Sequence, residues 1–65
     1  MSHFKNGDHV ITPLGSGKVN GKEYDGKGNV MRILVKFDEP NYWTKMTNLD
    51  IAAFWVHEVS KKDAP

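Results

Sequence analysis

Hydrophobic and polar residues alternate most regularly in the middle of the chain, over residues 30–37 (VMRILVKF). One face of this segment is apolar and consists of Met31, Ile33, Val35 and Phe37. The other face carries the basic residues Arg32 and Lys36, together with Val30 and Leu34. A period of two residues is typical of a half-buried strand, so the pattern predicts a strand here with its apolar face toward the core.

The residues before this strand predict a β-hairpin. Asp25-Gly26 and Gly28-Asn29 supply the residue types that tight turns need. Residues 17–24 (GKVNGKEY) should then form the antiparallel partner strand. Gly21 lies in the middle of that partner, where a glycine often marks a bulge or a sharp bend.

The flanking segments predict further strands. Residues 8–12 (DHVIT) form a short strand that ends at Pro13, and residues 38–41 (DEPN) form a turn. Residues 42–47 (YWTKMT) are aromatic and β-branched, which favours a fourth strand. Residues 48–60 fit two structures: a helix, or a helical turn at 49–52 followed by a strand over FWVHEV. We favour the second, because five strands leave fewer open edges than four strands and a helix.

Length and composition predict one small domain. We expect residues 7–60 to fold as the domain, with residues 1–6 and 61–65 as flexible ends. The 65 residues include no cysteine, which excludes disulfides and thiolate metal sites and fits a reducing cytoplasm. Neither a signal peptide nor an apolar run of about 20 residues is present, so we expect a cytoplasmic protein without a membrane partner.

The opening of the chain, FKNGDHVITPLGSGKV, resembles the opening of SH3-like domains of the KOW, Tudor-like and CarD-type group. The resemblance lies in a G-D-x-V phrase, a glycine-containing turn and a second strand: Gly7, Asp8, Val10, Pro13, Gly15, Gly17 and Val19. It implies an all-β fold, a small five-stranded SH3-like barrel with one short helical turn before the last strand. It also implies binding of RNA, DNA or another protein through loops and exposed aromatic residues.

Candidate chemistry is sparse. The run Gly15-Ser16-Gly17-Lys18 lacks the first glycine and the final Ser or Thr of a phosphate-binding loop, so we interpret it as a turn. His3, His9 and His57 lack the spacing and the cysteine companions of a metal site. No nucleophile with a matching base is apparent. We therefore expect no enzyme activity, no cofactor and no metal.

The aromatic residues point to a binding surface. Tyr42-Trp43 and Phe54-Trp55 are adjacent pairs, and neighbouring side chains of a strand point to opposite faces. Either the second ring of each pair is absorbed over a barrel end, or it is exposed. The exposed alternative predicts a patch of Trp43 or Tyr42 with Trp55, beside basic residues. The predicted site residues are Tyr42, Trp43, Lys45, Trp55, Arg32 and Lys18.

The low net charge favours protein binding over nucleic-acid binding as the first functional hypothesis. The net charge is +1 and the pI is near 8.0, whereas nucleic-acid-binding domains usually have a pI above about 9. The first hypothesis is a small non-enzymatic module that docks on a protein partner, for which chain size suggests a phage or mobile-element accessory or inhibitor protein. The alternative is a KOW or Tudor-like domain that binds RNA or DNA in transcription or translation. A homodimer formed through the exposed aromatics is a third possibility.

Overall fold

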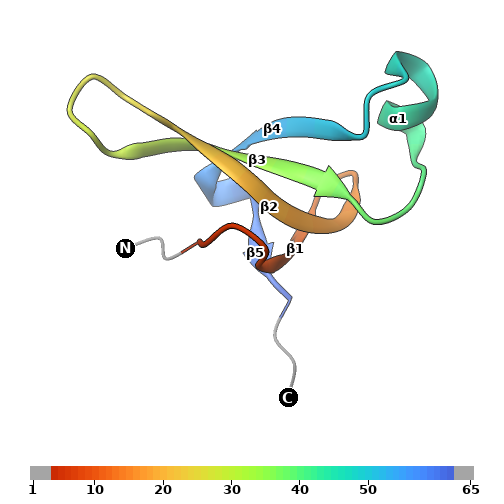
Figure 1. Ribbon diagram of the computed structural model, residues 1–65, viewed down its shortest axis with the longest axis horizontal. Helices are drawn as coiled ribbons and strands as arrows, with labels where there is room; N and C mark the ends of the chain where they lie inside the picture. The colour runs from red at the N-terminus through yellow and green to blue at the C-terminus, as the bar shows by residue number, and fades with distance from the viewer. Residues whose placement is uncertain (1–3, 63–65) are drawn as a thin grey trace.

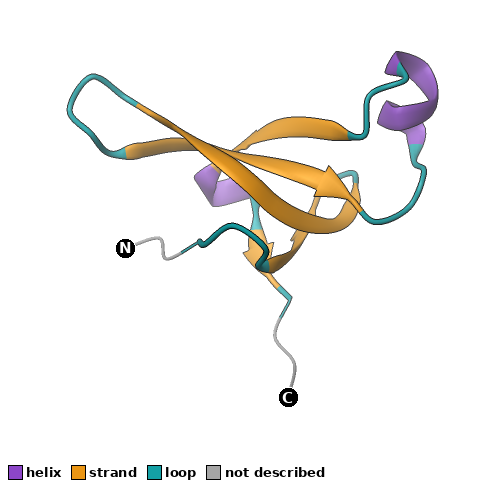
Figure 2. Cartoon of the chain, viewed as in Figure 1, coloured by secondary structure: helices purple, strands orange, loops and turns teal. Residues whose placement is uncertain are grey.

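The structure, a computed structural model, describes residues 4–62 and consists mainly of one antiparallel sheet (Figures 1 and 2). In chain order its elements are β1 (His9–Thr12), β2 (Gly15–Tyr24), β3 (Val30–Phe37), α1 (Tyr42–Thr47), β4 (Ile51–Trp55), η1 (Val56–Glu58) and β5 (Ser60–Lys61). The strand order is β4-β3-β2-β1-β5, with every pair antiparallel. The predicted mostly-β domain with five strands is confirmed. The sheet is open, with β4 and β5 as its edges, and does not close into the predicted barrel.

The core lies on the inner side of the curved sheet. Its buried side chains are Phe4, Val10, Val19, Ile33, Val35, Phe37, Phe54 and Val59. The rings of Phe37 and Phe54 meet edge to face, with centroids 6.1 Å apart. The predicted alternation of β3 is thus confirmed for Ile33, Val35 and Phe37.

Phe4 packs into the core from the N-terminal side of β1. This residue lies in the segment expected to be flexible, yet it is buried in the core. The Lys22 ammonium donates a hydrogen bond of 2.7 Å to the Phe4 carbonyl oxygen, and the Lys61 ammonium lies 5.9 Å from the ring centroid. At the other end, Lys61 belongs to β5 and the Lys62 N–H donates to the His9 carbonyl, while residues 1–3 and 63–65 lie outside the described residues.

The β2–β3 hairpin forms as predicted. At its turn the Asp25 carboxylate accepts backbone N–H groups of Lys27 at 2.7 Å and Asn29 at 3.0 Å, while Gly28 adopts φ +84°. These backbone hydrogen bonds, that of Asn29 first, hold the pKa of Asp25 below its ordinary value. The predicted turn chemistry therefore uses both the carboxylate and the glycine.

Two register shifts interrupt the hairpin. Pairing moves from Val19↔Val35 to Lys22↔Ile33, so that β2 has one extra residue at the predicted bulge around Gly21 (φ +139°). A second shift, between Glu23 and Tyr24, puts the extra residue on β3, at Met31. Met31 is therefore 37% exposed and does not join the buried apolar row, contrary to prediction.

Residues 42–47 form a helix, not the predicted fourth strand. The Asn41 side chain accepts from the Thr44 backbone N–H at 2.9 Å, and the Thr44 hydroxyl accepts from the Asn41 N–H at 2.8 Å. This reciprocal capping box begins the helix, and Asn48 in the left-handed conformation (φ 60°) ends it. Local capping outweighs the strand propensity of the aromatic and β-branched residues.

Residues 48–60 contain strand, as favoured, but the helical turn lies elsewhere. The strand β4 begins at Ile51, inside the segment expected to be a turn. The turn follows the strand as η1, and the chain then pairs with β1 through Val10↔Lys61 and Ile11↔Ser60. The predicted turn at 49–52 is thus wrong, as is the alternative of a helix over 48–60.

Side chains cover much of the free edge of β4. The Phe37 N–H donates to the Asp50 carbonyl oxygen, so Asp50 is hydrogen-bonded to β3. Hydrogen-bonded and outward-facing residues alternate along an antiparallel strand, and the backbone groups of Ile51, Ala53 and Trp55 therefore point away from β3. The Trp43 indole N–H donates to the Ile51 carbonyl at 3.0 Å, and the Trp55 N–H donates to the Glu58 carboxylate at 3.0 Å. Of these three residues, Ala53 in the middle of the edge has no such side-chain partner within residues 4–62.

Candidate functional site

The six predicted site residues fall into two groups on different parts of the molecule. Tyr42, Trp43 and Lys45 belong to α1, whereas Lys18, Arg32 and Trp55 belong to the sheet. Trp43 is anchored at Ile51, the first residue of β4, and Trp55 is the last. Four residues of strand separate these positions by about 13 Å, so the two aromatic pairs do not form one patch.

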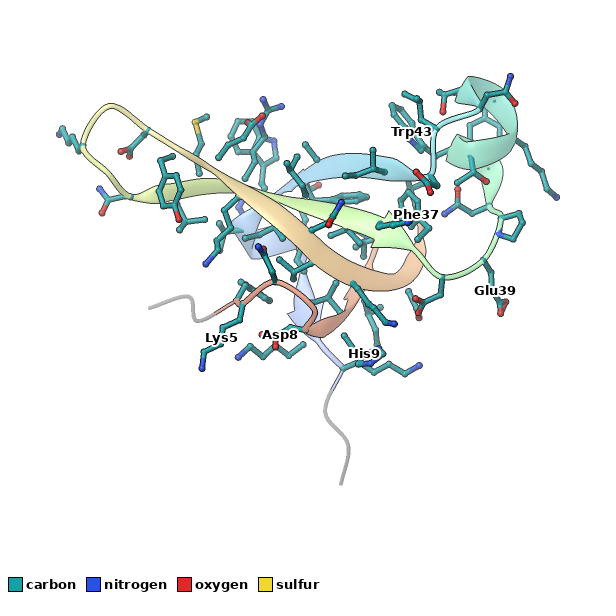
Figure 3. All side chains as sticks on the ribbon, viewed as in Figure 1. Lys5, Asp8, His9, Phe37, Glu39 and Trp43 are labelled. Carbon is teal, nitrogen blue, oxygen red and sulfur yellow. The ribbon has the colours of Figure 1, made fainter. Side chains whose placement is uncertain are left out.

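Trp43 is turned toward the sheet. It is half-buried, packs against the core, and uses its indole N–H to bind the β4 backbone. Figure 3 shows its ring on the side of α1 that faces β4. Of the two alternatives for this ring, the structure supports absorption over the end of the core, so Trp43 acts mainly by fixing α1 to the sheet.

The part of α1 beside Trp43 presents large apolar side chains to solvent. Tyr42 and Met46 are four residues apart on the helix and are 72% and 59% exposed. Leu49, just after the helix, is 52% exposed. We call these three residues the α1 face. Neither Met46 nor Leu49 was predicted, because the spacing of Tyr42 and Met46 has meaning only once the segment is a helix.

Polar residues lie close to the α1 face in the chain. Lys45 is exposed on the helix itself, and Asp38 and Glu39 are exposed in the loop before it. Glu39 points outward from this loop (Figure 3). The loop borders two shallow cavities of about 270 and 180 Å³, of which the larger is also lined by Gly15 and Ser16 of the glycine-rich turn.

Arg32 and Trp55 meet on the sheet. They are direct partners in the β3–β4 ladder, and the guanidinium carbon lies 5.8 Å from the centroid of the indole ring. The Arg32 side chain also forms an ion pair with Glu23 on β2. Trp55 remains 48% exposed. Of the predicted site residues, Arg32 and Trp55 are thus brought into direct contact as a cation–π pair.

Lys18 lies at the other end of the same sheet surface. It pairs with His9 on β1 and with Lys36 on β3, and all three side chains are exposed. Lys36 has a carboxylate within 4 Å, that of Asp50 at 3.9 Å. Among residues 4–62, no carboxylate lies within that distance of Lys18.

Other functional classes find little support in the described residues. Residues 4–62 contain no group of three or more His, Cys, Asp or Glu side chains placed to hold a metal ion. No helix in that range is long and apolar enough to cross a bilayer. The pKa of Asp8 is lowered, chiefly by the backbone N–H of Lys5, which indicates a structural role at the start of β1.

Comparison with known proteins adds no relative. No family model, no curated protein and no solved structure matches this chain. Two surfaces of the molecule are candidates for function: the α1 face, and the sheet surface that carries Arg32, Trp55 and Lys18.

Proposed function

We propose that this chain is a small non-enzymatic binding module that docks on a protein partner through the α1 face. The observation that carries the proposal is the exposure of Tyr42, Met46 and Leu49, each more than half exposed on one short segment. Aromatic residues and Met are enriched in protein interfaces, and contiguous exposed apolar residues are uncommon on soluble monomers.

The rigidity of α1 supports the same proposal. The capping box fixes the start of the helix, the Thr47 hydroxyl donates to the Trp43 carbonyl at 2.7 Å, and Trp43 ties the helix to β4. A six-residue helix is too short to be stable alone, so these contacts hold it in shape before any partner arrives. Such preorganisation lowers the entropy cost of docking.

The fold assignment supports a binding role by analogy only. The SH3-like assignment comes from the sequence resemblance, and the sheet, in which the last strand pairs with the first, stays open. Domains of this kind serve many functions, so the proposal depends on the α1 face. A role as a phage or mobile-element accessory protein and a cytoplasmic location remain predictions from the sequence.

The test compares two methionines. The tagged chain captures proteins from its native cell as wild type, as Met46→Gln and as Met31→Gln. Met31 is the control, because it is also exposed but lies on β3. We expect a partner that binds wild type and Met31→Gln, and binds Met46→Gln at least about 5-fold more weakly, the loss typical of an interface contact worth more than about 1 kcal/mol.

Two further measurements make the result decisive. Both variants should melt close to the wild-type temperature, since substitutions of exposed residues usually change stability by less than about 0.5 kcal/mol. Light scattering distinguishes a second copy of the chain from a different partner. An identical set of captured proteins for wild type and Met46→Gln would contradict docking through the α1 face.

A further inference from the structure

The outer surface of the sheet, opposite the core, is organised in three rows. Alternation along β3 places Arg32, Leu34 and Lys36 on this side, because Ile33 and Val35 point into the core. Each of these three residues defines one row across the neighbouring strands. We call this surface the outer face.

The first row holds planar groups. Arg32 lies over the ring of Trp55 and is held from the other side by the Glu23 carboxylate. The guanidinium and the indole are thus fixed beside each other at one end of the outer face. Both are groups on which an unpaired base can stack.

The middle row has small and apolar side chains on β3 and β4. Leu34 pairs with Ala53, and on β2 it faces the bulge at Gly21. A Cβ atom on Gly21 would lie 3.0 Å from the Leu34 Cδ1, so the leucine occupies the space beside the glycine. Asn20, the exposed β2 residue next to Gly21, adds a polar group beside Leu34 and Ala53.

The third row gathers positive charge. Lys18 and Lys36 are direct cross-strand partners, and like charges placed opposite each other destabilise a sheet. Asp50 lies 3.9 Å from Lys36, whereas within residues 4–62 no carboxylate comes within 4 Å of Lys18. A bound anion would relieve this repulsion, which indicates what kind of group this row suits.

We propose that the outer face binds single-stranded nucleic acid, with a base stacked at Trp55 and Arg32 and the phosphates at Lys18 and Lys36. The rows of Arg32 and Lys36 are four residues apart, about 13 Å, which allows one short strand to contact both. Exposed aromatics next to a basic groove are the usual features of such sites. An acidic peptide would satisfy the lysines but would leave the planar row without a matching group.

The site favours a single strand over a duplex. Stacking on Trp55 requires an unpaired base, which a duplex does not present. The near-neutral net charge of +1 fits a local site better than a general attraction to nucleic acid. This site shares no side chain with the α1 face and does not depend on the proposed protein docking.

The experiment measures fluorescence anisotropy of a labelled deoxythymidine oligomer of about 12 nucleotides with the purified full chain. If Lys18 and Lys36 each neutralise about one phosphate, the affinity falls about 18-fold between about 20 and 160 mM salt. In Lys18→Gln/Lys36→Gln the same change of salt should leave the remaining affinity nearly unchanged. This double variant removes a like-charge pair together with the exposed ion pair of Lys36 and Asp50, so its melting temperature should stay close to that of wild type.

Lys27→Gln/Lys45→Gln is the control, because it changes the net charge equally at the hairpin tip and on α1. It should bind as wild type does. Trp55→Leu should bind roughly 5- to 150-fold more weakly, and Trp55→Phe should retain most of the affinity. Met46→Gln should bind the oligomer normally, which separates this site from the α1 face.

Three results would overturn the proposal. The first is no binding at about 20 mM salt. The second is an equal loss in the two double-lysine variants, which would show that only total charge matters. The third is equal affinity for polyglutamate of the same length, or for a duplex of the same sequence length, which would show that unpaired bases are not recognised.

Discussion

Gly17 provides the sharpest test of how closely β2 and β3 pack. A Cβ atom on this residue would lie 2.4 Å from the Lys36 carbonyl oxygen and 2.6 Å from the Val35 Cγ1. Lys36 is part of the β2–β3 ladder and Val35 is fully buried, so neither atom can move without disturbing the sheet or the core. Gly17→Ala must therefore push the two strands apart.

The cost follows from the kind of atom that is contacted. Adding one methyl group to a packed core costs typically about 1–3 kcal/mol, and a contact with backbone lies at the upper end of that range. We expect Gly17→Ala to lose about 3 kcal/mol of unfolding free energy. A domain of this size has only about 3–10 kcal/mol in total, so the melting temperature should fall by about 12–24 °C.

Gly26→Ala is the matched control. Gly26 lies in the hairpin turn and does not adopt a positive φ, and a Cβ atom added to it would meet no other atom within 4 Å. Its substitution should change stability by less than about 1 kcal/mol, in the stabilising direction. Thermal and urea unfolding followed by circular dichroism measure both variants. If Gly17→Ala unfolds within about 1 kcal/mol of wild type, the close contact between β2 and β3 is wrong.

Two other predictions concern the turn and the sheet edge. The pKa of Asp25 is lowered by backbone N–H groups, so its stabilisation is complete above the ordinary value of 3.8 and is lost as pH falls through the lower folded-state pKa. Melting temperatures measured against pH should therefore fall below about pH 4, and less steeply in Asp25→Asn; parallel curves would contradict this. Glu58→Ala frees the Trp55 N–H at the edge of β4 and should promote self-association in light scattering, whereas Glu58→Gln keeps the acceptor and should stay as wild type. Equal scattering by both variants would show that Glu58 does not protect the edge.

Local signals in the sequence predicted the centre of the fold well. The hairpin, its turn and the bulge at Gly21 depend on residues next to one another in the chain, and all three are present. Residues 42–47 were mistaken for a strand because their aromatic and β-branched side chains favour one. The competing signal was the spacing of Asn41 and Thr44, which form the capping box of a helix.

The site was harder to predict because it depends on that helix and on strand register. In a strand Tyr42 and Trp43 would point to opposite faces, whereas in α1 Tyr42 shares a side with Met46. The pairing of Arg32 with Trp55 depends on how β4 aligns with β3 across a connection of more than ten residues. Individual residues could be chosen from the sequence, but their grouping into two surfaces could not.

The strand β4 links the two proposed surfaces. At its start the Ile51 carbonyl holds Trp43 and thereby α1, and at its end Trp55 lies beside Arg32 on the outer face. Since no side chain belongs to both surfaces, a protein on the α1 face leaves Trp55 and the paired lysines free. Binding at both surfaces would place a single strand and a protein about one strand length apart on a rigid sheet. Taken together, the two proposals predict that one chain can hold a single strand and a protein at the same time.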